Sequence, residues 1–84
     1  MKILSIGNSF SQDAQRWLHQ CAASAGVELT CVNLCIGGCP IVRHWNNVQS
    51  DEPTYEYEVN GEYVRHAALL DTLREEEWDV VTVQ

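Results

Sequence analysis

The stretch Lys2-Ile3-Leu4-Ser5-Ile6-Gly7-Asn8-Ser9-Phe10-Ser11, at the start of the chain, has the pattern of a strand, a sharp turn and a helix. Residues 2–6 are largely apolar, as in a short buried strand. Gly7 and Asn8 tolerate the dihedral angles of a tight turn, and a helical period begins at about Ser11. The turn therefore places Ser9 beyond the carboxyl end of a strand, where open α/β sheets bind their ligands.

Ser9 has two possible roles at this position. It can be a nucleophile, because the backbone N–H groups at the start of a helix favour developing negative charge. Alternatively Ser9 or Ser11 is the N-cap, and Ser9-Phe10-Ser11-Gln12 fits a capping box. Caps are far commoner than catalytic serines, but both roles are filled at once if Ser9 faces outward while Ser11 caps the helix.

The composition restricts the class of partner. The 84 residues are 45% hydrophobic and 20% charged, which predicts one small globular domain. The formal net charge of −7 argues against nucleic acid and an anionic membrane surface, because both need a basic footprint. No apolar run reaches the ~18 residues of a transmembrane helix, and the N-terminus lacks the pattern of a signal peptide. We expect a cytoplasmic protein, with export of a longer precursor as the alternative.

The cysteines predict neither disulfides nor a metal site. Cys21, Cys31, Cys35 and Cys39 lack the C-x2-C spacing of a zinc knuckle, and nothing else in the sequence implies a metal or a cofactor. Cys31 and Cys35 share one face of a predicted strand, and Cys21 lies on the apolar side of the first helix, so we expect buried, reduced thiols there. Cys39 follows a glycine turn and is expected to be exposed.

The first helix is predicted over residues 11–25, followed by a second strand over residues 27–35. The helix has one apolar stripe, which we expect to be buried, formed by Ala14, Trp17, Leu18, Cys21, Ala22 and Ala25. His19 falls on its polar side. The strand is apolar on both faces, as in a parallel sheet covered twice. Gly37-Gly38 follows it, so a second glycine turn is expected at the same edge of the sheet as Ser9.

The second half of the chain predicts two helices, a hairpin and a third strand. Residues 41–49 have the pattern of a short helix that ends at residues 50–53, with His44 partly exposed near the site. Residues 55–64 alternate around Asn60-Gly61, a strong signal for a hairpin, which we expect at the surface. A helix over 66–77 and a buried-type strand over 79–84 follow. Because such a strand normally precedes a covering helix, we expect the chain to be the first part of a longer α/β domain.

The three strand ends together resemble the SGNH, or GDSL-like, hydrolase superfamily of serine esterases and lipases. The matching blocks are Gly7-Asn8-Ser9-Phe10-Ser11, Asn33-Leu34-Cys35-Ile36-Gly37-Gly38 and Asp79-Val80-Val81. More narrowly, the opening is similar to a bacterial branch of that superfamily known as a domain of unknown function. The resemblance implies a flavodoxin-like, three-layer α/β/α fold with a parallel sheet. Residues 1–84 would be the N-terminal portion of one such domain, incomplete, with an inserted β-hairpin near residues 55–64.

The resemblance also implies the roles of particular residues. Ser9 matches the nucleophile, and its N–H contributes to the oxyanion hole. Gly38 best matches the glycine that gives a second N–H, with Gly37 as the alternative. Gly7, Asn8 and Gly37 would support these turns, although Asn8 stands where most of the superfamily has Asp.

The rest of the catalytic machinery is expected after Gln84. In the family an oxyanion-hole Asn follows the third block closely, and an Asp-x-x-His near the end of the domain completes the triad. None of the histidines of this chain, His19, His44 and His66, stands in a D-x-x-H context. Any of them is therefore a poor substitute for the base.

We therefore expect a serine ester hydrolase whose Ser9 attacks an acyl ester or carbohydrate ester of neutral or cationic character, without metal or cofactor. The 84-residue chain alone is expected to be inactive, because it lacks the catalytic His and Asp. The alternative is a non-catalytic α/β fragment that binds a small molecule or an anion at the same edge, although no phosphate-binding glycine motif is present. A third hypothesis is a fragment without activity of its own that pairs with another chain or self-associates through the exposed edge at Val80–Val83.

Overall fold

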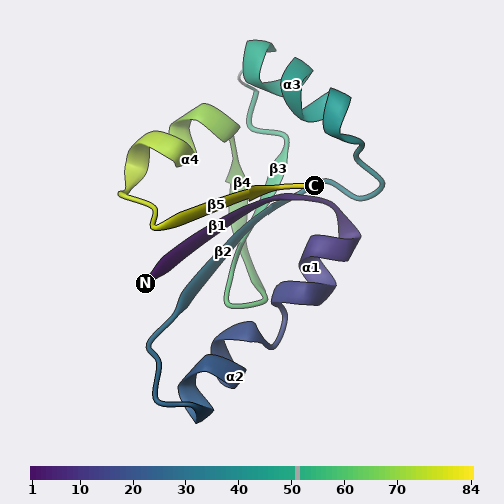
Figure 1. Cartoon of the computed structure of the whole chain (residues 1–84). Helices are drawn as coiled ribbons and strands as arrows, with labels where there is room; N and C mark the ends of the chain where they lie inside the picture. Colours follow the sequence, from purple (N-terminus) through teal and green to yellow (C-terminus); the bar gives the residue numbers. More distant parts are fainter. Residues whose placement is uncertain (51) are drawn as a thin grey trace.

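The computed structural model of the chain describes residues 1–50 and 52–84 (Figure 1). It shows a mixed α/β fold, which confirms the predicted class. The elements in chain order are β1 (Lys2–Gly7), α1 (Ser9–Gln15), α2 (Leu18–Ser24), β2 (Thr30–Cys35), α3 (Ile41–Ser50), β3 (Tyr55–Val59), β4 (Glu62–Ala67), α4 (Leu69–Glu75) and β5 (Val80–Val83). Asp51, in the predicted break after α3, lies outside the described residues.

The strands form one five-stranded sheet in the order β4-β3-β2-β1-β5. β1 pairs in parallel with both β2 and β5. β3 pairs antiparallel with β2 and with β4. The predicted parallel sheet is therefore only part of a mixed sheet. The hairpin is not a surface insertion, because the alternating apolar side chains of Tyr55, Tyr57 and Val59 let β3 extend the sheet beyond β2 and join its core.

The hairpin turn has the conformation that its sequence predicts. Asn60 and Gly61 both have positive φ, of 52° and 86°, as a two-residue turn between twisted strands requires. The side chain of Asn60 also accepts a hydrogen bond from the N–H of Cys31 at 2.9 Å. This bond ties the hairpin tip to the beginning of β2.

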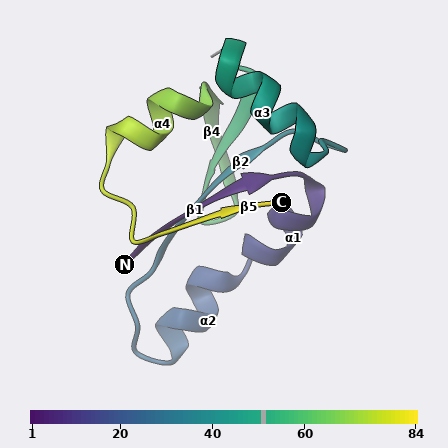
Figure 2. The same ribbon diagram turned by 45° about the horizontal axis from the view of Figure 1, so that its top comes forward.

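Helices cover both faces of the sheet. Figure 1 and Figure 2 show α3 and α4 on one side and α1 and α2 on the other. The hydrophobic core lies on the side of α3 and α4, and its buried members are Leu4, Ile6, Val32, Leu34, Tyr55, Ala67 and Leu69. Half-buried Val48, Leu73 and Trp78 pack against it from the helices and the loop before β5. Apolar packing therefore holds helices on only one face of the sheet, the face covered by α3 and α4.

The first helical segment differs from the prediction in both its bounds and its orientation. Instead of one helix over residues 11–25, α1 begins at Ser9 and a break at Arg16–Trp17 separates it from α2. The break lies where the hairpin packs, since a Cβ added to Gly61 would be 3.0 Å from the carbonyl oxygen of Arg16. α1 buries Ser11 and Gln15, and α2 buries no residue.

The expected apolar stripe of this segment is consequently not in the core. Trp17 is 58% exposed and Leu18 38% exposed. The polar side of α1 faces the sheet instead, because the strands below it carry buried Ser5, Asn33 and Glu58. Polar helix side chains find hydrogen-bond partners there, whereas apolar ones would leave those groups unpaired.

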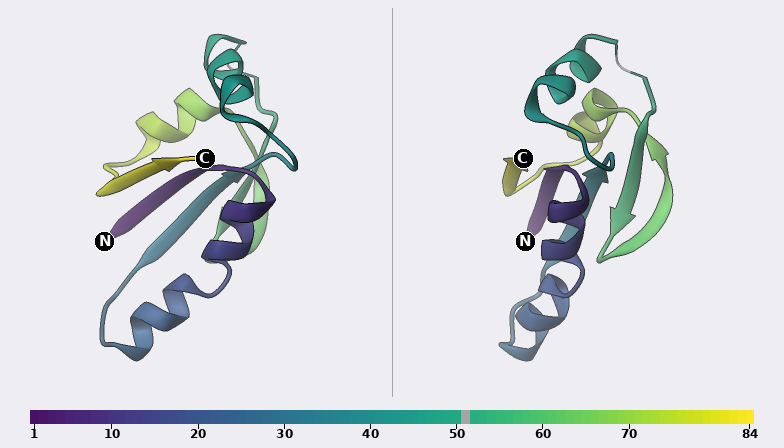
Figure 3. Two further views of the ribbon diagram at one scale, coloured as in Figure 1. Left: turned by 45° about the vertical axis from the view of Figure 1, so that its right-hand side comes forward. Right: turned by 90° about the vertical axis from the view of Figure 1, so that its right-hand side faces the viewer.

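The last elements lie at the β5 side of the sheet. The helix expected from residue 66 begins at Leu69, because His66 and Ala67 continue β4. Figure 3 shows the hairpin and β5 on opposite sides of the molecule, in agreement with the strand order. All residues of β5 are exposed, and its valines range from 40% for Val80 to 55% for Val83, as expected of an uncovered edge. None of the helices in residues 1–50 and 52–84 is long and apolar enough to cross a membrane.

Candidate functional site

Asn8, and not a serine, caps α1. The side-chain oxygen of Asn8 accepts a hydrogen bond from the N–H of Phe10 at 3.0 Å. In return the hydroxyl of Ser11 accepts a bond from the N–H of Asn8 at 3.1 Å, which completes a capping box. The predicted box from Ser9 to Gln12 is therefore wrong by one residue. Asn wins the capping position because its short side chain reaches the second and third amides of the helix without strain.

Ser9 is consequently free of any capping role. It occupies the first position of α1 and is exposed. Its hydroxyl makes no hydrogen bond within the part of the chain that the structure describes. Its backbone N–H, like those of all first-turn residues, has no partner inside the helix. Both groups of Ser9 can therefore contact a ligand.

The second glycine turn lies beside the first. The N–H of Cys39 donates to the carbonyl of Ile36 at 3.1 Å, and Gly38 within this turn has a φ of +68°. The turn is joined to the first by a bond from Asn8 Nδ2 to the carbonyl oxygen of Cys39 at 3.2 Å. Gly37 and Gly38 are both exposed. The structure therefore brings together all the sequence-predicted site residues at one edge of the sheet.

Gly7 supports this geometry by its lack of a side chain. A Cβ at this position would stand 2.5 Å from Ser11 Oγ and 2.8 Å from Ser11 Cβ. Because Ser11 belongs to the capping box, it cannot move away without opening the turn. Gly7 is thus required by close approach and not by an unusual φ.

His44 is buried and fully engaged, whereas the sequence predicts a partly exposed side chain. It is 3% exposed. Its Nε2–H donates to the carbonyl oxygen of Gln84 at 3.0 Å, so Nδ1 accepts the hydroxyl proton of Tyr55 at 2.8 Å. Asn47 donates to the same Tyr55 oxygen at 3.1 Å. Burial lowers the pKa of His44, although the bond to Gln84 opposes this effect. The ring is therefore held neutral and offers no free nitrogen as a base.

The other histidines lie on β4 and α2. His66, on the outermost strand β4, pairs its Nδ1 with the hydroxyl of Tyr63 at 2.8 Å. His19 lies on α2 and is half-buried, not solvated as predicted, and its Nδ1 has no partner among the described residues. No histidine in residues 1–50 and 52–84 forms a hydrogen bond with Ser9.

The cysteines are free, and two of their predicted environments are exchanged. Cys31 and Cys35 are buried as predicted, and burial, followed by the charge of Glu58, raises the pKa of Cys35 to about 11. Cys21 is exposed because the apolar side of α2 faces solvent. Cys39 is 1% exposed, since the positive φ of Gly38 turns the chain inward and brings the thiol to 3.7 Å from His44 Nδ1. Three or more potential metal ligands gather nowhere in the described ranges.

A polar row beneath α1 is the feature that sequence reasoning missed. Thr82, Ser5, Asn33 and Glu58 are successive cross-strand neighbours on β5, β1, β2 and β3. The available signal is a polar residue inside each of these strands: Ser5, Asn33 and Thr82 between apolar neighbours, and Glu58 in the alternating pattern of β3. Because side chains alternate between the two faces of a strand, Ser5, Asn33 and Thr82 are predicted to lie on the same face of the sheet once the pairing register is known.

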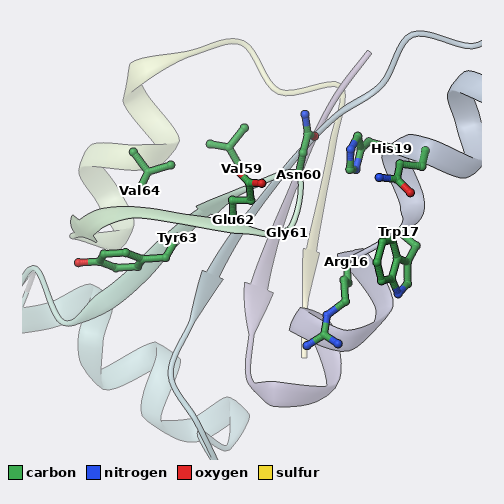
Figure 4. A pocket seen from close by; sticks show the side chains of 10 residues that line it. Arg16, Trp17, His19, Val59, Asn60, Gly61, Glu62, Tyr63 and Val64 are labelled. Carbon is green, nitrogen blue, oxygen red and sulfur yellow. The ribbon is translucent and has the colours of Figure 1, made fainter.

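Two surface grooves lie elsewhere on the molecule. One, of about 560 Å³, separates the α1–α2 junction from the hairpin, between the side chains of Arg16, Trp17 and His19 and those of Glu62 and Tyr63 (Figure 4). It is far from Ser9, because the hairpin tip pairs with the beginning of β2 while Ser9 follows the end of β1. The second, of about 320 Å³, is apolar and lies between α3, α4 and β5.

The comparisons with known proteins agree with this architecture. Residues 2–84 match the family model DUF4886, a domain of unknown function. The chain is also similar to the crystal structure of a DUF4886 family protein from Bacteroides uniformis, with 37% sequence identity and a TM-score of 0.90. That match covers 100% of this chain and 35% of the other, so the chain spans about a third of the length of this relative. No curated protein matches. The chain belongs to the DUF4886 family.

Proposed function

We propose that this chain carries the nucleophile of an SGNH-type serine ester hydrolase, with Ser9 attacking an acyl carbonyl. The observation that carries the proposal is the free, exposed hydroxyl of Ser9, which stands at the carboxyl edge of the sheet while Asn8 does the capping. A serine needed only for the helix would be engaged in the cap, as Ser11 is. A hydroxyl presented without a structural partner is suited to attack a substrate once a base removes its proton.

The two glycine turns supply the electrostatic part of this mechanism. A tetrahedral intermediate needs N–H donors aimed at its oxyanion. The N–H groups of Ser9 and Gly38 make no hydrogen bond to another described residue and belong to turns that the Asn8–Cys39 bond holds together. We assign these two amides to the oxyanion hole, with Asn8, Gly7 and Gly37 as supporting residues.

The base and its orienting acid belong, in this proposal, to a part of the domain outside residues 1–84. His44 is buried and bonded, His66 pairs with Tyr63, and neither His19 nor His66 forms a hydrogen bond with Ser9 among the described residues. The finer architecture, a flavodoxin-like SGNH domain of which this chain is the N-terminal part, is likewise proposed. It is supported by the parallel β2-β1-β5 core and by a family relative about three times as long.

The substrate we propose is a small acyl or carbohydrate ester of neutral or cationic character. The formal net charge of −7 disfavours anionic substrates. Phe10, 75% exposed and next to Ser9, offers an apolar surface for the acyl group. The carbohydrate alternative rests on resemblance alone.

The test is active-site labelling of the protein as its gene encodes it. A fluorophosphonate probe should label Ser9, and Ser9→Ala should lower ester hydrolysis by at least about 10³-fold, to the residual level that remains after loss of a nucleophile. Ser24→Ala, a change at an exposed serine on α2, is the matched control and should leave both readouts unchanged. Labelling at another residue, or hydrolysis that survives Ser9→Ala, would overturn the assignment.

Anion binding is the second candidate, favoured by the same unpartnered amides of Ser9 and Gly38. In that case inorganic phosphate should raise the melting temperature of the chain equally in the wild type and in Ser9→Ala. The esterase proposal expects no such stabilisation. A thermal melt with and without phosphate therefore separates the two functions.

A further inference from the structure

The polar row under α1 consists of two hydrogen-bonded groups, one around Ser5 and one around Asn33 and Glu58. Thr82 Oγ1 donates to Ser5 Oγ at 2.8 Å, and Gln15 of α1 donates to the same oxygen. Further along the row, Asn33 Nδ2 donates to Glu58 Oε1 at 3.0 Å. Both faces of a sheet covered by helices are normally apolar. Burying the polar side chains of Ser5, Asn33 and Glu58 there is costly and restricts how α1 can sit on the sheet, whereas Thr82 at the edge is exposed.

Glu58 is the charged member of this row. It is 4% exposed, and its oxygens accept bonds from the side-chain amides of Asn33 (3.0 Å) and Gln12 (2.6 Å). No Lys or Arg in the described ranges forms an ion pair with it, since the salt bridges there join Lys2 to Glu76 and Arg65 to Glu75. A buried carboxylate held by two neutral amides, rather than by a cation, acts through its hydrogen-bond geometry.

That geometry sets the orientation of the turn before Ser9. An ionised carboxylate only accepts hydrogen bonds, so Asn33 must present Nδ2 to Glu58 and Oδ1 to the opposite side. There Asn33 Oδ1 lies 3.0 Å from Ser11 Oγ and shares its single hydroxyl proton with the carbonyl oxygen of Asn8, at 2.8 Å. Ser11 in turn accepts the N–H of Asn8 at 3.1 Å. A chain of bonds thus leads from Glu58 to the residue that precedes Ser9.

We propose that Glu58 is a positioning residue for the Ser9 turn, acting through Asn33 and Ser11 on the backbone of Asn8. It also fixes Gln12, so that one carboxylate on β3 orients two side chains of the first turns of α1. The role of this positioning in catalysis rests on the proposed function. The positioning itself does not, and it can be measured in the chain alone.

The double variant Glu58→Gln/Asn33→Asp, called the swap below, separates this positioning role from simple packing. In Glu58→Gln the new amide cannot accept from Gln12 and Asn33 together, so one of the bonds is lost or reversed. Asn33→Asp in the wild-type background would place two carboxylates face to face. In the double variant, the aspartate at position 33 accepts from both Ser11 and the glutamine at position 58, which still accepts from Gln12. Every hydrogen bond is then restored with the charge moved by one strand.

The first readout is amide hydrogen exchange of the 84-residue chain. Glu58→Gln should speed exchange at Asn8 and Phe10 by at least about fivefold relative to amides of β2, and the swap should return it to within about twofold of wild type. Glu56→Gln, on the same strand but exposed, is the matched control and should change neither amide. Unchanged exchange in Glu58→Gln, or faster exchange that the swap does not restore, would overturn the proposal. If Glu58→Gln fails to fold, a folded swap with protected amides supports it and an unfolded swap rejects it.

The second readout separates this inference from the proposed function. In the protein as its gene encodes it, Glu58→Gln should slow fluorophosphonate labelling of Ser9 about tenfold, with recovery in the swap. If the wild type is not labelled at Ser9, the esterase proposal fails while the exchange data still decide the positioning. If Ser9 is labelled equally fast in the wild type and in Glu58→Gln, the esterase proposal stands and the catalytic role of Glu58 is rejected.

Discussion

Ser9 and Ser11 stand in the same turn of helix, yet their hydroxyls have different surroundings. Ser11 Oγ is buried among Asn8 and Asn33, with which it forms hydrogen bonds. Ser9 Oγ is exposed and makes no hydrogen bond to another described residue. The difference arises because Asn8 takes the capping position, which shifts the capping box by one residue. A one-residue shift therefore separates a structural serine from a candidate nucleophile.

His44 makes the free energy of unfolding depend on pH, and the burial of its ring determines the sign of that dependence. Its pKa is lowered in the folded chain, chiefly by burial, so below the ordinary value of 6.5 the unfolded chain binds this proton more readily than the folded one. The stability it supports is therefore complete above pH 6.5 and is lost as pH falls through the lowered pKa. Urea unfolding at pH 7.5 and at pH 5.5 should show this loss in the wild type. The loss should be smaller in His44→Phe, which cannot titrate.

The control for this measurement is His66→Gln, because His66 is exposed. It should keep the full pH dependence of the wild type. An equal loss of stability in His44→Phe and in the wild type would show that other groups carry the dependence.

The sequence predicts the position of a single residue where that position depends on its immediate neighbours in the chain. The glycines of the two turns and the position of Ser9 follow from short patterns in the sequence. The burial of Cys39 and of His44 does not, because it depends on α3 folding back over the end of β5, where His44 meets the carbonyl of Gln84. Such contacts between distant segments have no signature in the neighbouring residues.

At the scale of elements, the strands were predicted better than the orientation of the first helix. Alternation and β-branched residues identify β1, β2 and the hairpin directly. The apolar stripe of residues 14–25 pointed to the wrong side, because the sheet face beneath α1 is polar and hydrogen bonds outweigh the apolar periodicity there. The local pattern likewise predicts a parallel sheet with an inserted hairpin, whereas β3 pairs antiparallel with β2, because the partner of β3 depends on register and not on local pattern.

The second glycine turn offers a matched pair of substitutions that tests its backbone conformation. Gly38→Ala should lower the free energy of unfolding by about 1 kcal/mol, because its φ of +68° is unfavourable for alanine. Gly37→Ala should change it by less than about 0.5 kcal/mol, since Gly37 has no positive φ. Nothing lies within 4 Å of the Cβ position at either residue, so steric overlap does not contribute. Urea unfolding of both variants checks this, and equal effects would contradict the proposed turn geometry.

At the scale of the whole molecule, the two edges of the sheet differ in their protection. β4 carries Glu62, Arg65 and His66 along one edge, and charged side chains discourage pairing with another chain. β5, at the other edge, has the uncharged sequence Val80-Val81-Thr82-Val83 and borders the apolar groove under α3 and α4. In a family relative whose chain is about three times as long, further residues are available to cover such an edge.

This asymmetry predicts where the 84-residue chain associates with itself. Sedimentation velocity over a concentration series should show reversible oligomers of the wild type, and Val81→Lys should shift the chain toward monomer, because a buried charge opposes edge pairing. Val64→Lys is the matched control: Val64 is 54% exposed on β4 and Val81 is 45% exposed on β5. The control should leave the oligomers unchanged, since the β4 edge is already charged. A monomeric wild type at every concentration, or equal dispersal by both variants, would show that β5 is not the associating edge. The apolar groove beside it would then be solvated in the isolated chain.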